Sequence, residues 1–220
     1  MRVVKGDFKM NLIKRINLNF TENKFFYLIV LSFFFIGILM GSYTIKYMEG
    51  IDSTDLSNYF TEFIKSLNGG EVKNKELFIN IIKNNFILIF LIIALGFTFF
   101  GAPIILIVDL IKGFTLGYTF TFLLTTFDGE GIWIALSTTI PQNIFYIPFF
   151  IGISILAIEI SIKRFKSKIL NVQATSKLIA RKIITKYSFL ILLFFIGVMI
   201  ECFISPGLIK LIVTKVYKLT

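Results

Sequence analysis

The feature that most constrains the fold is a run of 42 residues, 86–127, in which only Asp109 and Lys112 are charged. One helix crosses a bilayer with about 20 residues, so this run is long enough for two membrane spans. We place the break between them at Gly101-Ala102-Pro103, because glycine suits the end of a helix and proline the first turn of the next one. The hydrophobicity is continuous rather than alternating, which favours helices over a transmembrane barrel.

Charged residues are few and unevenly placed along the rest of the chain. They make up 16% of the 220 residues, against 56% that are hydrophobic, and they gather between long uncharged runs. In lipid every backbone polar group must be bonded within a helix or a closed barrel. The pattern therefore predicts an all-α, polytopic transmembrane helical bundle with about five spans. The expected segments are 1–24, a cytoplasmic basic amphipathic segment; 25–43, span 1; 44–85, an extracytoplasmic helical loop; 86–100, span 2; 103–124, span 3; 132–162, span 4 with proline breaks; 163–186, a cytoplasmic basic loop; 187–204, span 5; and 205–220, a tail.

The distribution of Lys and Arg predicts which side of the membrane each loop occupies. With five spans, segments 1–24 and 163–186 share one side, and they carry six and eight basic residues. The loop 44–85 lies on the other side and carries five basic against six acidic residues. Basic loops face the cytoplasm, so we expect a multi-pass membrane protein with a cytoplasmic N-terminus. The basic tail, which this arrangement places outside, departs from the rule.

The predicted fourth span contains two prolines, Pro141 and Pro148. Each removes an amide donor and frees a carbonyl one turn earlier, so we expect either a kinked helix or a half-helix joined to a full one. Gln142 and Asn143 follow the first proline, and amide side chains inside a membrane are costly unless they are paired. We favour an internal staple for the freed carbonyls over a substrate or ion site, which broken helices form in transporters.

Ionisable residues within the predicted spans are further candidates. Asp109 and Lys112 are three residues apart on one helix, where an internal ion pair is the simpler interpretation and a functional polar site the alternative. Glu201 lies near the outer end of the fifth span, where it could hydrogen-bond a neighbouring helix or reach the headgroups.

Two glycine pairs have the GxxxG spacing that allows helices to approach closely. Gly37 and Gly41 lie in the first span, and Gly113 and Gly117 in the third. The close approach could occur within one subunit or between subunits, so a homo-oligomer is possible.

Residue types needed for catalysis are scarce. The chain has no histidine and one cysteine, so it has no Ser-His or Cys-His nucleophile pair and no cysteine metal cluster. No phosphate-binding loop is present. The net charge of +10 follows from the basic loops rather than from a nucleic-acid-binding face. We therefore expect no catalytic residue, no cofactor, no metal site and no nucleic-acid partner.

The order of several motifs resembles the stage II sporulation protein M family over nearly the whole chain. The resemblance rests on four groups of residues. They are Gly96, Gly101 and Pro103 around the turn between the second and third spans; Lys112-Gly113 with Gly117; Pro141-Gln142-Asn143 with Pro148; and the segment from Glu201 to Pro206. The Pro-Gln-Asn element and the terminal Ser-Pro are the most specific of these motifs.

The resemblance implies a non-enzymatic membrane scaffold required for engulfment during endospore formation. Such a protein would sit in the septal or engulfing membrane of the bacterial mother cell. Its partners would be membrane lipids and stage II sporulation proteins D and P, which degrade peptidoglycan. The outer loop would supply the docking face, since its apolar residues fall on one helical side; packing of this face on the bilayer is an equal alternative. These residues are Leu56, Tyr59, Phe60, Phe63, Ile64 and Leu67.

Two other functions remain open on the sequence. The first is a small transporter or channel subunit, in which Asp109, Lys112 and the break at 141–143 form a polar path. The second is a membrane-assembly protein of vegetative cells, which the timing of expression would separate from a sporulation protein.

Overall fold

Five long helices make up the computed structural model, which describes residues 24–47, 74–126, 131–170, 176–209 and 211. Within these residues the chain forms helices and turns and no strand. Each helix is long and apolar enough to cross a membrane, which confirms the predicted all-α bundle of five spans. The helices are α2 (Lys24–Lys46), α4 (Asn74–Gly96), α5 (Gly101–Thr126), α6 (Gly131–Leu170) and α7 (Ser176–Met199), and the last is continued by a π-helical turn, η2 (Ile200–Ile204).

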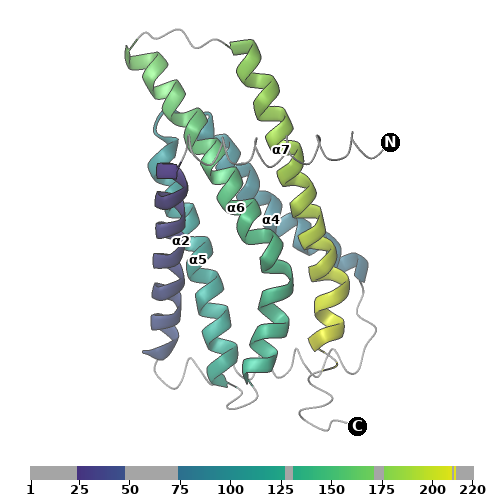
Figure 1. Cartoon of the computed structure of the whole chain (residues 1–220). Coiled ribbons are helices and arrows are strands. Elements are labelled where there is room, and N and C mark those ends of the chain that lie inside the picture. The colour runs from purple at the N-terminus through teal and green to yellow at the C-terminus, as the bar shows by residue number, and fades with distance from the viewer. Residues whose placement is uncertain (1–23, 48–73, 127–130, 171–175, 210, 212–220) are drawn as a thin grey trace, which may run out of the picture.

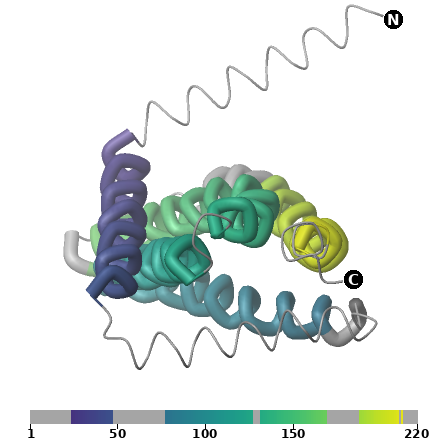
Figure 2. The backbone as a smooth tube through the Cα atoms, turned by 90° about the horizontal axis from the view of Figure 1, so that it is seen from below, coloured from purple at the N-terminus to yellow at the C-terminus, as the bar shows by residue number. Residues whose placement is uncertain are grey.

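The helices form an arc with α5 and α6 at its centre (Figures 1 and 2). In this arc α2 packs on α5, α7 packs on α6, and α4 crosses beside α5 and α6. The most buried of the five is α6. The start of α2, the α4–α5 turn and the end of α6 all lie at one end of the bundle (Figure 1).

The turn between the second and third spans differs slightly from its predicted position. α4 ends at Gly96 rather than at residue 100, and α5 already begins at Gly101. The break therefore consists of residues 97–100, and Pro103 falls within the first turn of α5. A proline is tolerated there because the first amides of a helix have no partner within it.

The prolines of the fourth and fifth spans lie inside continuous helices. α6 is a single helix through Pro141 and Pro148, so the half-helix alternative is wrong, and the helix bends along its length instead (Figure 1). We also expected Ser205-Pro206-Gly207 to end the last span, but the helix runs through them to Ile209. Pro206 has no amide proton for the carbonyl of Cys202. The π-helical turn directly precedes this proline, and the Ser205 amide donates to the carbonyl of Ile200.

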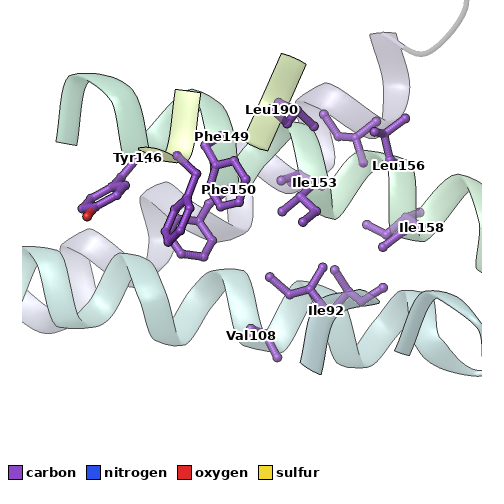
Figure 3. Close-up of a cluster of buried hydrophobic side chains, with 14 of the residues drawn as sticks. Ile92, Val108, Tyr146, Phe149, Phe150, Ile153, Leu156, Ile158 and Leu190 are labelled. Carbon is purple, nitrogen blue, oxygen red and sulfur yellow. The ribbon is translucent and has the colours of Figure 1, made fainter. Parts of the chain in front are cut away.

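The main hydrophobic core lies where α4, α5, α6 and α7 meet. Figure 3 shows part of it, with side chains of α6 gathered over Val108 of α5 and Ile92 of α4. Phe149 of α6 packs on Phe194 of α7 with 5.1 Å between ring centroids. A smaller cluster joins α2, α5 and the start of α6 near the other end of the bundle. The large apolar side chains left exposed lie along all five helices, as expected where lipid is the solvent.

Candidate functional site in the membrane interior

The two GxxxG pairs pack directly against each other within one chain. A Cβ atom added to Gly37 would lie 2.1 Å from the carbonyl oxygen of Leu110, and one added to Gly113 would lie 2.1 Å from that of Phe34. Gly41 and Gly117 show the same contacts one turn further along. α2 and α5 therefore touch backbone to backbone, which only glycine allows.

Two hydroxyl groups extend this glycine contact. The Thr121 hydroxyl donates to the Ser42 hydroxyl at 2.9 Å, and the Ser42 hydroxyl donates to the carbonyl of Gly117 at 3.4 Å. Hydrogen bonds of this kind between helices stabilise membrane bundles. The α2–α5 pair is thus a preformed structural unit of the bundle.

Ser161 of α6 holds the turn between α4 and α5. Its side chain is fully buried; it donates to the carbonyl of Thr98 at 2.8 Å and accepts from the amide of Ala102 at 3.1 Å. The Thr98 carbonyl lies in the turn and the Ala102 amide in the first turn of α5, where backbone groups have no partner within a helix. Nearby, Gly96 lies so close to Ala157 that an added Cβ would be 2.9 Å from the Ala157 side chain. Two of the predicted glycines, Gly96 and Gly101, therefore serve this tight turn.

Asp109 and Lys112 do not form the ion pair with each other that their spacing predicts. Asp109 is only 3% exposed and accepts a hydrogen bond of 2.6 Å from Ser154 of α6. Lys112 donates to Asn85 of α4 at 3.5 Å, and its ammonium lies 4.7 Å from the ring centroid of Phe150. The two charged residues thus join α5 to two different neighbours.

Glu201 hydrogen-bonds a neighbouring helix, which decides between its two predicted surroundings. The Tyr146 hydroxyl of α6 donates to the Glu201 carboxyl group at 2.6 Å. One turn away, the Ser205 hydroxyl donates to the side-chain oxygen of Gln142 at 2.9 Å. Because both bonds join antiparallel helices at the same register, they set the alignment of η2 against α6.

The side-chain amides after Pro141 bond carbonyls of their own helix, although not the Ser137 carbonyl that the predicted staple was meant to satisfy. Gln142 donates to the carbonyl of Thr138, and Asn143 donates to that of Thr139 at 2.7 Å. These carbonyls directly follow that of Ser137, which Pro141 deprives of its usual donor. Gln142 has a second role because its oxygen faces Ser205, so it links the proline bend to the last helix.

We call the polar side chains that bond between α4, α5, α6 and the last helix the intramembrane polar cluster: Asn85, Asp109, Lys112, Gln142, Tyr146, Ser154, Ser161, Glu201 and Ser205. Sequence reasoning missed several members, since single small polar residues in apolar helices carry no spacing signal. The missed residues are Asn85, Tyr146, Ser154 and Ser161, whereas Ser205 was noted only as part of the terminal Ser-Pro motif.

The intramembrane polar cluster joins neighbouring helices through hydrogen bonds between their side chains. Among the described residues, no group of three His, Cys, Asp or Glu side chains could hold a metal ion. Cys202 is buried in η2.

The predicted docking residues of the outer loop, from Leu56 to Leu67, lie outside the described part of the chain.

A bundle of five apolar helices with buried polar side chains in its interior defines a multi-pass α-helical membrane protein. The family model described as Stage II sporulation protein M matches residues 30–206, and the chain therefore belongs to that family of sporulation membrane proteins. Neither a curated protein nor a solved structure matches the chain.

Proposed function

We propose that this chain is a non-enzymatic membrane scaffold for engulfment during endospore formation. It recruits stage II sporulation proteins D and P, which degrade peptidoglycan, and anchors them at the septal membrane of the mother cell. Membership of the Stage II sporulation protein M family supports the sporulation setting. The observation that carries the scaffold role is the use of intramembrane polar groups as contacts between helices.

The hydrogen bonds of the polar cluster each join two elements of the bundle. Ser154 bonds Asp109, Tyr146 bonds Glu201, and Ser161 bonds the turn next to Gly101. A transport path requires polar groups that are free to exchange partners with a solute. Polar side chains that hydrogen-bond one another across helices make the bundle rigid, and a protein that anchors partners needs a rigid bundle.

The docking surface in this proposal is the apolar face from Leu56 to Leu67 in the outer loop. Tyr59, Phe60 and Phe63 are the three aromatic residues of that face, and Phe60 and Phe63 are its phenylalanines. Aromatic side chains contribute most of the binding energy in many protein interfaces. In this arrangement the N-terminus is cytoplasmic and the loop faces the wall-degrading partners.

Co-purification from sporulating cells tests the proposal directly. The tagged full-length chain is expected to retain both hydrolases, and Phe60→Ser with Phe63→Ser is expected to release them. Asn58→Ala with Thr61→Ala is the matched control, because these positions lie between the apolar ones in the same segment. The proposal fails if the wild-type chain retains neither hydrolase, or if the control pair releases them equally.

One observation favours a second candidate, a small transporter or channel subunit. The Oδ2 atom of Asp109 and the Oγ1 atom of Thr139 are buried without a hydrogen-bond partner, and an unsatisfied buried polar atom requires an explanation. Solute or ion flux into proteoliposomes that depends on Asp109 would support this candidate. Asp109→Asn combined with Lys112→Met is expected to abolish such flux but to leave hydrolase retention intact if the scaffold proposal is right.

A further inference from the structure

Exposed rings and exposed cations meet at the end of the bundle that carries the α4–α5 turn. The Arg164 guanidinium carbon lies 5.1 Å from the ring centroid of Phe97, and the Lys168 ammonium lies 4.3 Å from that of Phe99. Both cations belong to α6 and are spaced four residues apart, so they project from one face of the helix. We call Phe97, Phe99, Arg164 and Lys168 the ring-cation patch.

The height of the ring-cation patch follows from the length of α6. With 40 residues, this helix is about 60 Å long at 1.5 Å per residue, about twice the thickness of a bilayer core. Ser161 touches the α4–α5 turn, so this turn marks the level at which two spans end. Arg164 and Lys168 lie one and two turns beyond Ser161, at the depth of lipid headgroups.

The cations of the patch are not neutralised by carboxylates. Lys163 pairs with Glu159 at 2.6 Å, whereas neither Arg164 nor Lys168 is paired with an acidic side chain among the described residues. The sequence from 163 to 186 contains eight basic and no acidic residues. A ring occupies one side of each cation, and no carboxylate in the described part of the chain takes up its N–H groups.

The rings of the patch are also incompletely covered. Phe97 is 54% exposed and Phe99 is 38% exposed, and Phe100, which packs on Phe99, is 61% exposed. A ligand that fits the patch must therefore combine a negative charge with an apolar surface directly beside it. An anionic phospholipid has this chemistry, because its phosphate lies immediately above its acyl chains.

We propose that the ring-cation patch binds the phosphate of an anionic phospholipid, with the acyl chains of that lipid covering the phenylalanine rings. Arg164 and Lys168 hold the phosphate oxygens, and Phe97 and Phe99 keep the two cations in place by cation–π contact. Basic sites at the ends of membrane helices bind such headgroups in this manner. The site is separate from the scaffold role, because it uses neither the outer loop nor the intramembrane polar cluster.

Titration of the full-length protein in a neutral detergent with phosphatidylglycerol tests the proposal. Binding is measured by native mass spectrometry and by the shift of the thermal midpoint. Arg164→Gln with Lys168→Gln is expected to weaken the apparent affinity by roughly fivefold for each cation removed. Lys163→Gln with Lys166→Gln removes the same charge from the same helix end without touching the rings, and is expected to change affinity by less than about threefold.

A further variant and two control ligands complete the experiment. Phe97→Leu with Phe99→Leu keeps every charge and is expected to weaken phosphatidylglycerol binding several-fold, roughly as the loss of two cation–π contacts predicts. Phosphatidylcholine with the same acyl chains and inorganic phosphate alone are both expected to bind far more weakly.

Three results would overturn the proposal. Equal losses in the two charge variants would mean that net charge, and not this patch, attracts the lipid. Equal binding of phosphatidylcholine or of inorganic phosphate would reject an anionic lipid as the ligand. Unchanged phosphatidylglycerol affinity in the Arg164→Gln, Lys168→Gln variant would also reject it, and would point to an acidic protein segment as the partner.

Discussion

The Tyr146 hydroxyl donates a 2.6 Å hydrogen bond to the Glu201 carboxyl group and thereby joins α6 to the π-helical turn of the last helix. Tyr146 is 4% exposed, so its hydroxyl group has little access to water. The same ring lies against Gly197, where an added Cβ would be 2.6 Å from its Cε1 atom. One side chain thus sets both the distance and the rotation of the last helix.

We expect Tyr146→Phe to lower the free energy of unfolding by about 1–3 kcal/mol, because it leaves the Glu201 carboxyl group without this donor. The measurement is the unfolding midpoint of the purified protein in mixed detergent micelles. Tyr43→Phe is the matched control, since Tyr43 of α2 is 60% exposed. Equal shifts in the two variants would contradict a specific role of the Tyr146–Glu201 bond.

Replacing glycine by alanine should lower stability at the α2–α5 contact and raise it at an open helical position. Gly113→Ala would place a methyl group 2.1 Å from the Phe34 carbonyl oxygen, so the helices must separate at a cost of about 1–3 kcal/mol. Gly207→Ala meets nothing within 4 Å in a helical stretch, and the helix propensity of alanine should stabilise it by up to about 1 kcal/mol. Thermal unfolding of both variants checks the prediction, and stabilisation of Gly113→Ala would disprove the close contact.

The sequence was sufficient for the number and type of the elements and insufficient for their pairing. The length and continuity of the apolar runs predicted five spans, because membrane thickness fixes helix length. Gly37 and Gly113 each predicted a close helix neighbour, but nothing in either motif indicated that they meet each other. A GxxxG spacing describes the shape of one surface and leaves its partner undetermined.

The interior polar residues show the same limit more sharply. Spacing along one helix predicted that Asp109 and Lys112 would pair, since only their own helix is visible from the sequence. In the fold Ser154, 45 positions away, supplies the donor to Asp109 instead. Pro141 and Pro148 were expected either to kink their span or to divide it, and α6 is one continuous, bent helix that packs on α2, α4, α5 and α7.

The bond pair at Ser161 makes the α4–α5 turn depend on a residue of α6. Ser161→Ala removes the donor to Thr98 and the acceptor for Ala102 together, and each unsatisfied backbone group costs about 1–3 kcal/mol. We expect a lower unfolding midpoint and faster hydrogen exchange at residues 97–102. Ser167→Ala on the exposed face of the same helix is the control. Unchanged exchange in Ser161→Ala would rule out the proposed clamp on the turn.

Lys112 of α5 and Glu201 of η2 both approach the same part of α6, where Lys112 lies 4.7 Å from the ring centroid of Phe150 and Glu201 accepts a hydrogen bond from Tyr146. Two charges in a poorly hydrated interior should be coupled more strongly than two at a surface, because the surrounding dielectric is lower. A double-mutant cycle with Lys112→Met and Glu201→Gln is therefore expected to give a coupling energy of about 0.5–3 kcal/mol. The matched cycle uses Lys163→Met and Glu159→Gln, whose ion pair includes a lysine side chain that is 44% exposed, and should give about 0.3–0.5 kcal/mol. A coupling at Lys112–Glu201 no larger than this value would show that the last helix is held by Tyr146 and Ser205 without help from the lysine.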